Sequence, residues 1–332
     1  MKIGQLTESV MKRSVLREIQ YHRNEVLSGA TLGDNCAILS LDEDEILVTE
    51  SITVAAPVTD AGGYAIQRVA NEIAVRGAQP VAVNLSGSMF PENYEEEQLH
   101  QWMKQAEAIA AKLQIQIVGA NGTVTKAVNQ PVIHITGIGK AAKNCYLLTS
   151  GAVAGQDVVV TKWIGLEGTA IIAHLKEDEL RTRFSTDYIE EAKGLKQWLS
   201  VLPEAALAGK SDAGDISLIA EGGVFGALWN MAERSGVGLK VELKKIPIRQ
   251  ETVEICNYYD VNPYELLSSG SLLITTENGG DLVKRLSAEG IEAVVIGKTT
   301  ADNDRLIVNE EEKRFLTPPQ PDALYKVTDK HN

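Results

Sequence analysis

The sequence predicts a mixed α/β protein with two domains. Its 332 residues are many for a single hydrophobic core, because most domains hold about 100–150 residues. The hydrophobic fraction of 44% and the charged fraction of 23% are those of a globular protein and not of a disordered or fibrous one. Segments with helical and with strand periodicity alternate along the chain, so we expect each domain to combine helices with a sheet.

The first half of the chain alternates between predicted strands and helices. An amphipathic helix is predicted over 14–26, and short apolar strands are predicted over 36–39 and 46–49. Further predicted elements are a helix over 63–77, a strand over 81–85, a helix over 91–113, and strands over 115–118 and 132–136. The 91–113 helix has the clearest pattern, because apolar residues recur on one face and Glu95, Glu96 and Glu97 complement the helix dipole.

A change of pattern near residue 145 marks the predicted domain boundary. Residues 140–155 are small and polar, and an all-β-branched strand begins at Val158. We predict domains over 1–144 and 145–309, followed by a loosely packed extended tail over 310–332 with three prolines. In the second domain, the predicted elements are helices over 168–175 and 224–232, the latter ending at Gly236, and a strand over 293–296.

Charge and cysteine usage exclude several classes of partner. A net charge of -13 opposes binding to nucleic acid and to anionic membrane surfaces. The chain opens without the apolar core of a secretory signal and has no membrane-spanning run, which predicts a cytoplasmic protein. Cys36, Cys145 and Cys256 lie far apart without CxxC spacing, so we expect reduced thiols, no disulfide and no zinc.

Three carboxylates in the first domain are candidate metal ligands. Asp34 lies in a Gly-Asp-Asn turn, Glu50 ends the predicted 46–49 strand, and Glu72 lies inside the 63–77 helix. Mg²⁺ prefers oxygen ligands and usually takes one or two protein carboxylates together with nucleotide phosphates and water. These residue types therefore suit Mg-ATP. The spacing leaves open a turn cap at Asp34, surface charges at both glutamates, or a hydrogen-bonded structural carboxylate at Glu72.

Two glycine-containing loops in the second domain precede helices. Gly165 and Gly168 flank one helix start, and Gly222 and Gly223 flank another. Exposed backbone N–H groups at a helix N-terminus can hold phosphate, and Lys162 could neutralise its charge. Simple turn geometry at the glycines and an exposed lysine after a strand are the alternative interpretation.

Other catalytic motifs are absent from the sequence. None of the five histidines belongs to an HExxH motif, and no serine lies in a GxSxG motif. No GxGxxG follows a strand and no GxxxxGK[ST] occurs, so hydrolase, metalloprotease, Rossmann and P-loop interpretations are set aside. His134 alternates with Ile133 and Ile135 on a predicted strand, which favours a solvated or hydrogen-bonded side chain over a catalyst.

Taken in order, these segments resemble the aminoimidazole ribonucleotide synthetase (PurM-like) superfamily, with the strongest likeness to hydrogenase expression/formation and "AIR synthase related" proteins. In the first domain the resemblance rests on an acidic turn over 33–39, a TDS-like strand end over 48–51, and an NDxA…GAxP-like helix over 71–80. In the second it rests on the opening strand over 155–161, the helix over 221–228, and a glycine turn over 268–272.

The resemblance implies a fold, a cofactor and an assembly. The first domain would be a half-barrel sheet with helices that completes a barrel on homodimerisation, and the second an α/β sandwich. Family members use ATP to phosphorylate an oxygen of a substrate. ATP and Mg²⁺ would be held near the dimer interface, with Asp34, Glu50 and Glu72 as metal ligands. The residues assigned to nucleotide binding are Asp34, Asn35, Glu50, Asn71, Glu72, Gly119, Asn121, Lys162, Gly165, Gly168, Gly222 and Gly223.

The sequence departs from the family pattern at several of these positions. Asn35, Glu50 and Glu72 stand where aspartate is usual, and Asn121 lies in a GG[DH]T-like turn. The expected DxTxGG element has lost both its acid and its hydroxyl, which Leu218 and Ala220 replace. Because Mg²⁺ needs near-ideal octahedral geometry, these changes should weaken phosphoryl transfer more than folding.

Two functional hypotheses follow from this combination. The first is a Mg-ATP-binding homodimer with a degraded site, which would act on an unidentified small substrate or a maturation-type protein partner by ATP-dependent phosphoryl transfer or ligase-type chemistry. The second is a non-catalytic dimeric paralogue that acts by protein interaction. Hydrogenase-maturation proteins work through a C-terminal cysteine, whereas this chain ends Lys330-His331-Asn332, so that particular activity is not expected.

Overall fold

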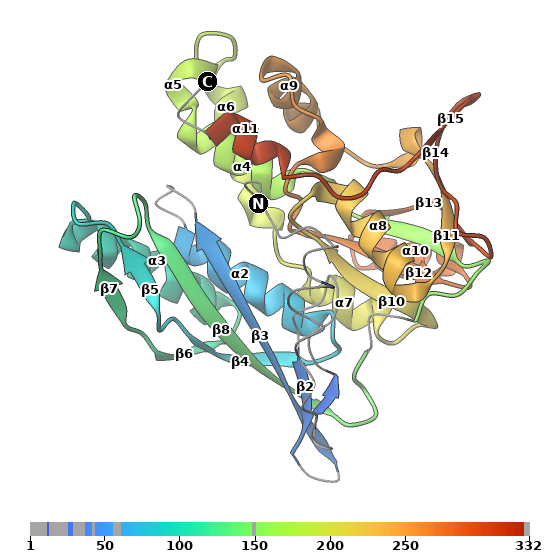
Figure 1. Cartoon of the computed structure of the whole chain (residues 1–332), viewed down its shortest axis with the longest axis horizontal. Helices are drawn as coiled ribbons and strands as arrows, with labels where there is room; N and C mark the ends of the chain where they lie inside the picture. Colours follow the sequence, from blue (N-terminus) through green and yellow to red (C-terminus); the bar gives the residue numbers. More distant parts are fainter. Residues whose placement is uncertain are drawn as a thin grey trace. The chain divides into compact units, whose positions relative to one another are not determined.

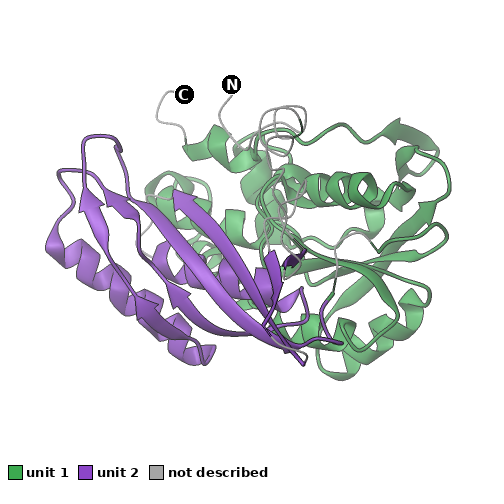
Figure 2. Cartoon of the chain, turned by 60° about the horizontal axis from the view of Figure 1, so that its bottom comes forward, with its two compact units in different colours: residues 1–20, 147–332 green, residues 21–146 purple. Residues whose placement is uncertain are grey.

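The computed structural model describes residue 12 and residues 26–28, 37–41, 44–55, 61–147 and 151–328. The chain divides into two compact units, which Figure 2 colours separately. Residues 21–146 form the N-terminal unit, and residues 1–20 with 147–332 form the C-terminal unit. The predicted helix over 14–26 lies almost entirely outside the described residues. No helix among those that are described is long and apolar enough to cross a membrane.

The N-terminal unit holds one sheet and two described helices (Figure 1). Its strands are β1 (Val26–Ser28), β2 (Ala37–Ser40), β3 (Glu45–Ala55), β4 (Gln79–Asn84), β5 (Ser88–Phe90), β6 (Gln116–Gly119), β7 (Gly122–Val124) and β8 (Val132–Ala142). Its helices are α2 (Ala61–Ala74) and α3 (Glu96–Lys112). The sheet runs β1-β2-β3-β8-β4-β6, and β5 pairs with β8 and β7. Only the β4–β6 and β5–β7 pairs are parallel among these strands.

Helix α2 covers one face of this sheet, and the core of the unit lies between them. A methyl group added at Gly137 of β8 would lie 2.6 Å from Val69 Cγ2 and 2.7 Å from Ile73 Cδ1. A methyl group added at Gly139, on the same face, would lie 2.3 Å from Ile73 Cγ2. The two glycines therefore let the helix approach the strand more closely than any larger residue would allow.

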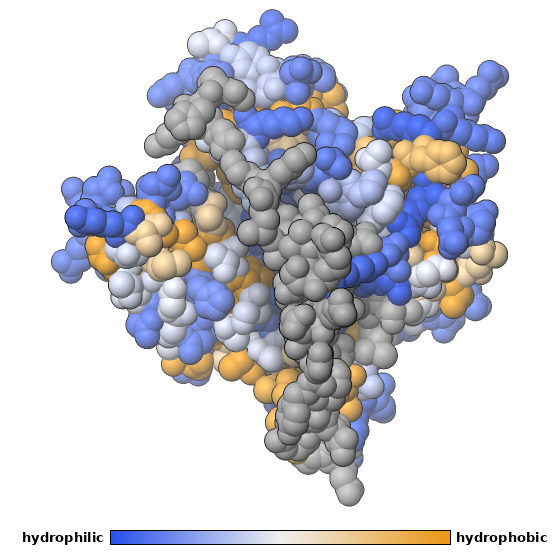
Figure 3. Space-filling model, in the orientation of Figure 1, coloured by the Kyte–Doolittle hydropathy of each residue, from blue (hydrophilic) through white to orange (hydrophobic). Residues whose placement is uncertain are grey.

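The opposite face of β3 and β8 carries hydroxyl groups. Ser51 Oγ lies 2.8 Å from Thr136 Oγ1, and Thr53 Oγ1 lies 3.2 Å from His134 Nδ1. The contact of His134 confirms the prediction of a hydrogen-bonded histidine on this strand. Figure 3 shows apolar and polar residues side by side on this face of the unit, as expected for a surface that is neither a pure core nor fully solvated.

Strand β3 is longer than the sequence predicted, which corrects the position of Glu50. The predicted strand ended at Thr49, with Glu50 at its edge. The observed strand continues through Ser51, Ile52 and Thr53 to Ala55, and β8 pairs with it along its whole length. The β-branched residues after Glu50 favour the extended conformation, so the carboxylate lies in the middle of the strand.

The clearest predicted helix is confirmed, with a later start. Helix α3 begins at Glu96, after a capping box in which Gln98 Oε1 accepts from the Glu95 N–H at 2.9 Å. Trp102, Ala106 and Ala110 of the predicted apolar stripe are buried. These side chains recur every four residues, which places them on one face of the helix.

The C-terminal unit contains a second mixed sheet. Its strands are β9 (Asp157–Thr161), β10 (Ala213–Ile219), β11 (Gly238–Glu242), β12 (Ser271–Thr276), β13 (Ala293–Thr300), β14 (Arg305–Asn309) and β15 (Glu312–Phe315). Its α-helices are α4 (Leu166–Leu175), α5 (Glu177–Leu180), α6 (Thr186–Gly194), α7 (Leu202–Ala208), α8 (Gly223–Ser235), α9 (Gln250–Tyr258), α10 (Gly279–Ala288) and α11 (Ala323–Thr328). Short 3₁₀ turns are η2 (Leu195–Trp198), η3 (Leu243–Lys245) and η4 (Pro263–Glu265).

This sheet runs β10-β12-β9-β13-β11-β14-β15, and only β11 and β14 are parallel neighbours among the described strands. A core cluster packs α8 against the sheet through side chains that include Val160, Leu228, Met231 and Leu273. Helix α8 is stopped by Gly236, which follows Ser235 and adopts a left-handed conformation with a φ of +64°, as predicted.

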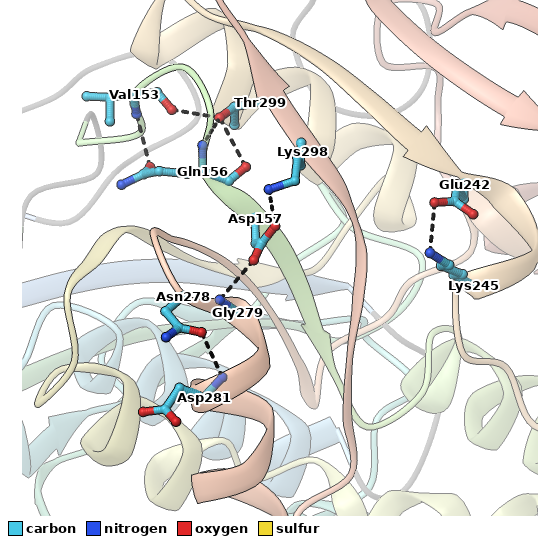
Figure 4. Close-up of polar contacts among 10 residues, drawn as sticks. All are labelled: Val153, Gln156, Asp157, Glu242, Lys245, Asn278, Gly279, Asp281, Lys298 and Thr299. Atoms are coloured by element: carbon cyan, nitrogen blue, oxygen red, sulfur yellow. Dashed lines mark hydrogen bonds and ion pairs between the residues drawn. The ribbon is translucent and has the colours of Figure 1, made fainter.

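The first strand of this unit is fixed by an aspartate (Figure 4). Asp157 Oδ2 accepts from the Gly279 N–H at 3.0 Å, at the start of α10, and Asp157 Oδ1 lies 2.8 Å from Lys298 Nζ of β13. Asn278 caps the same helix, because its side chain accepts from the Asp281 N–H at 3.1 Å. Asp157 therefore adds an anionic cap to the neutral cap of Asn278, and it ties β9, β13 and α10 together.

The tail is more ordered than the sequence predicted. The prediction was a loosely packed extension over 310–332. The structure instead pairs β15 with β14, and it buries Leu316, Asp322, Ala323 and Val327. Among the tail's described residues, only 317–321 form an exposed stretch without helix or strand on the way to α11. The prolines of that stretch suggested a loose tail, but the side chains on either side of it are buried.

Candidate functional site

Glu50 is a buried acid on an apolar surface. Its side chain is 3% exposed, and it lies on the same face of β3 as the buried residues Ile46, Val48 and Val54. It pairs across the sheet with Gly137, the glycine that contacts Val69 and Ile73 of α2. Directly opposed residues point to the same side of a sheet, so the Glu50 carboxylate lies on the face that α2 covers.

The polar residues of the NDxA-like segment lie on that same helix. Asn71 is fully buried, and its Oδ1 accepts from Gln67 Nε2 at 3.0 Å, while Glu72 is half-buried. Both residues lie between Val69 and Ile73, the two positions that rest on Gly137. Glu50 and the Asn71–Glu72 segment are thus on the same side of the sheet.

The predicted metal ligand Asp34 and the predicted nucleotide-binding residue Asn35 lie outside the described residues. Within the described ranges, no three histidine, cysteine or acidic side chains gather closely enough to hold a metal ion. Cys145 is exposed and Cys256 is buried, both as free thiols, while Cys36 is not among the described residues.

Gly119 and Asn121 belong to a compact pair of turns. Asn121 Oδ1 accepts from the Gly87 N–H at 3.0 Å, and Gly119 O accepts from the Leu85 N–H at 2.8 Å. Asn84 Oδ1 lies against Gly119 and accepts from the Ser86 N–H at 2.9 Å. The side chain at position 121 therefore holds the β4–β5 turn against the β6–β7 turn.

Lys162 is buried and fully paired, in contrast to the exposed lysine or phosphate ligand considered from the sequence. Its Nζ lies 2.6 Å from Glu204 Oε1 and donates to the carbonyl oxygens of Trp198 at 2.8 Å and Ser200 at 2.6 Å. Burial lowers the pKa of Lys162, and Glu204 raises it in part. An ammonium group has three N–H donors, and these partners use all of them.

Gly165 and Gly168 permit close packing around the start of α4. The Gly165 N–H donates to Ser268 Oγ at 2.7 Å, and the Gly168 N–H donates to Leu267 O at 2.9 Å. A methyl group at Gly168 would lie 2.5 Å from Leu266 Cγ. Ser268, which sequence reasoning placed in a glycine turn without a role, is thus the partner of this helix start.

Gly222 is the N-cap of α8 and Gly223 its first residue, and their φ angles are +83° and +62°. The Gly222 N–H already has an anionic partner, because it donates to Asp322 Oδ2 at 2.7 Å. Sequence reasoning missed Asp322. The available signal was local: an aspartate followed by Ala323 and Leu324 is a typical helix N-cap, and Asp322 Oδ1 accepts from the Leu324 N–H at 2.8 Å.

Two family models match the chain in sequence order. Residues 33–141 match the N-terminal domain of the AIR synthase related proteins, and residues 153–309 match their C-terminal domain. Together the two matches span most of the chain. The chain belongs to the AIR synthase related family. Asp322 lies beyond the part of the chain that matches the models.

Among related sequences of this family is a Methanocaldococcus jannaschii protein assigned to hydrogenase expression and formation, 23% identical over 340 residues, covering 98% of this chain and 97% of that protein. Carbamoyl dehydratase HypE of Azotobacter vinelandii is 23% identical over 318 residues, covering 93% of this chain and 88% of that protein. Thiamine-monophosphate kinase of Pyrococcus horikoshii is 26% identical over 257 residues, covering 75% and 76%.

Solved structures share the fold. A hydrogenase maturation protein HypE in complex with ATP superposes with a TM-score of 0.72 at 18% identity, covering 96% of each chain. A HypE–HypF complex gives a TM-score of 0.69 at 20% identity, covering 85% of this chain and 93% of that one. These similarities confirm the predicted mixed α/β, PurM-like fold. The half-barrel closure and the dimer remain predictions.

Proposed function

We propose that this AIR synthase related protein is a Mg-ATP-binding homodimer with a weakened active site, related to the hydrogenase-maturation branch of the family. The observation that carries the proposal is the buried carboxylate of Glu50 on the α2-covered face of the sheet. A buried acid in an apolar layer is costly for folding alone and is typical of a functional site.

The residues of this face suit a magnesium ion by their chemistry. Glu50, Asn71 and Glu72 offer oxygen atoms, which Mg²⁺ prefers, and no thiol or imidazole competes among these three. We propose Asp34, Glu50 and Glu72 as the ligands, with Asn35, Asn71, Gly119 and Asn121 near the nucleotide. Bound Mg²⁺ would neutralise phosphate charge, and the side chains would orient the nucleotide.

Support for ATP as the nucleotide comes from the relatives. One HypE structure of the same fold was solved in complex with ATP, and another relative is a kinase of thiamine monophosphate. If this chain transfers a phosphoryl group, its small substrate is unidentified. Glutamate in place of aspartate at positions 50 and 72 moves each carboxylate by a methylene group, so we expect weak or undetectable turnover.

We expect magnesium-dependent ATP binding by the wild-type protein, and a loss of about tenfold or more in affinity for Glu50→Gln. The amide keeps the size of the side chain but removes the negative charge that would offset the cation. Titration calorimetry with ATP, with and without Mg²⁺, measures this. The matched control is Glu45→Gln, an exposed glutamate of the same strand, which should bind like the wild type.

A restored variant extends the test. Asn35→Asp with Leu218→Asp and Ala220→Thr should strengthen Mg-ATP binding before any turnover returns, because added carboxylates stabilise the bound dication. Equal binding by the wild type and Glu50→Gln would remove the support for a nucleotide site on this face. Tight wild-type binding that the restored acids weaken would mean that the present residues form an intact alternative site.

A second candidate function is a non-catalytic paralogue that acts by protein interaction. The specific observation that favours it is the occupation of groups considered for phosphate: the ammonium of Lys162 and the N–H groups of Gly165, Gly168 and Gly222 all have partners within the chain. A relative of the same fold was solved as a HypE–HypF complex, so a maturation-type protein is the partner class that we propose for this alternative.

Homodimerisation through the N-terminal unit is expected under both functions. The hydroxyl-lined face of β3 and β8 is not the face that α2 covers, and closure of a barrel would remove the exposed sheet edges. Light scattering at micromolar concentration should therefore give twice the mass of the 332-residue chain. Thr136→Lys, which places a charge on this face, should give monomers, and Lys140→Thr on the same strand should remain dimeric. A wild-type monomer would contradict the proposal.

A further inference from the structure

The C-terminal segment places an acid on the N-terminus of α8. The Asp322 side chain is 3% exposed, and its two oxygens accept from three backbone N–H groups. Oδ2 accepts from Gly222 at 2.7 Å, while Oδ1 accepts from Leu267 at 3.2 Å and from Leu324 at 2.8 Å. Negative charge is stabilised at a helix N-terminus, so Asp322 occupies the place that an external anion would take.

Helix α11 adds contacts on both sides of Asp322, which anchors the segment. Tyr325 Oη donates to Glu221 Oε1 at 3.1 Å, next to the Gly222–Gly223 turn. Ala323 and Val327 are buried in a cluster with apolar side chains of α4, α6 and α9. Figure 1 shows α11 beside α4, in agreement with these contacts. The cluster also contains Cys256, whose thiol is fully buried.

The residues before Asp322 are exposed, in contrast to the buried residues of the docked segment. All five residues of the stretch 317–321 are exposed, and three of them are prolines. Proline-containing segments are extended and semi-rigid, so this stretch can hold the following residues close to the protein even when they are undocked. The docked part is therefore short and bounded: it begins at Asp322 and comprises the six-residue helix α11.

We propose that residues 322–328 form a strap that closes the N-terminus of α8 and opens as a unit from the exposed stretch 317–321. When the strap is closed, its Asp322 carboxylate accepts from the Gly222 N–H, and the strap covers Cys256. When open, it exposes both. The strap goes beyond the proposed nucleotide function, since its opening depends on no nucleotide.

Cys256 is a native reporter of the open state. Burial, together with the nearby Asp322 carboxylate, raises the pKa of its thiol to about 12, so the closed state reacts slowly with thiol reagents. A chain with Cys36→Ser and Cys145→Ser keeps Cys256 as its single thiol. Its labelling rate with N-ethylmaleimide, followed by intact mass, then measures how often the cluster opens.

We expect Asp322→Ala in this background to raise the labelling rate of Cys256 by at least about tenfold, because three N–H groups lose their common acceptor. The matched control is Asp281→Ala, which removes an exposed aspartate from the first turn of α10 and should label like the parent. Hydrogen exchange of the same proteins should show faster exchange in α11 and in Gly222 and Leu267, with unchanged protection in β9 and β12.

Two results would overturn the proposal. Labelling of Asp322→Ala at the parental rate would show that the aspartate does not hold the segment closed. Loss of protection throughout the C-terminal unit would show that the segment is part of the cooperative core and no strap. If Asp322→Ala does not fold, hydrogen exchange of the unaltered protein decides: α11 must exchange faster than β9 and β12, and equal protection contradicts a separate opening.

Discussion

Glu204→Ala is expected to lower the free energy of unfolding of the C-terminal unit by about 3–5 kcal/mol, the usual effect of removing one partner of a buried ion pair. Lys162 and Glu204 are 7% and 3% exposed, and the substitution leaves the ammonium group with only two carbonyl partners. Urea unfolding followed by tryptophan fluorescence measures the change, because Trp198 belongs to the same cluster of contacts.

An exposed pair of the same chemistry serves as the control. Lys245 and Glu242 are 2.8 Å apart (Figure 4), but both side chains are about half exposed. Glu242→Ala should therefore change stability by less than about 1 kcal/mol. The double variant Lys162→Met with Glu204→Leu should recover most of the loss, because an apolar pair leaves no buried charge.

The pH dependence separates charge from packing. Burial lowers the pKa of Lys162, and the Glu204 charge that partly opposes this shift is absent in Glu204→Ala. A lysine with a depressed pKa releases its proton more readily in the folded state, so stability rises with pH towards the ordinary lysine range. The loss in Glu204→Ala should thus be smaller at pH 9.5 than at pH 7. A loss that is equal at both pH values would point to packing alone.

Local patterns predicted the parts of this fold that depend on neighbours in the sequence. The apolar stripe of α3 repeats at helical spacing, and Gly236 supplies the left-handed end that α8 needs. Both features can be recognised without knowledge of the rest of the chain. The family resemblance added the order of the elements, which periodicity does not specify.

Long-range partners account for what the sequence did not reveal. Lys162 looked like an exposed lysine after a strand, and its burial depends on Glu204, 42 positions later. The glycines before α8 looked like an open anion site, and their partner Asp322 follows Gly222 by 100 positions. Glu50 was recognised as a candidate, but its position within the strand depended on pairing with β8. The roles of Asp34 and Asn35 remain predictions, because both residues lie outside those that the structure describes.

Raising the pH from 4 to 7 is expected to increase the opening of the 322–328 strap, by up to roughly a hundredfold. Burial and the neighbouring Glu221 carboxylate raise the pKa of Asp322, and the N–H groups of Leu324, Gly222 and Leu267 lower it in part, so that its pKa is about 6. An undocked aspartate has its ordinary pKa near 3.8. Other ionisable groups of the strap and its surroundings are Tyr325 and Lys326 on α11 itself, the Cys256 thiol of α9, and Tyr258 and Tyr259, which pack against the same cluster.

The sign follows from these two pKa values. Below about pH 3.8 the carboxyl group is protonated whether the strap is docked or not, and docking is strongest. Between about 3.8 and 6 the docked acid keeps its proton while the undocked acid loses it, so docking weakens steadily. Above about pH 6 both forms are ionised, and the opening equilibrium becomes independent of pH.

Hydrogen exchange of α11 between pH 4 and 7, corrected for the intrinsic pH dependence of amide exchange, measures the opening equilibrium. Asp322→Asn should open more than the wild type at pH 4, because an amide can accept on only one atom, and its opening should not change with pH. Glu221→Gln removes the neighbouring negative charge and should shift the wild-type transition to lower pH. A strap that closes more tightly as the pH rises would mean that the three N–H donors and the α8 dipole outweigh the burial of the charge, and that the ionised form of Asp322 docks better than the protonated form.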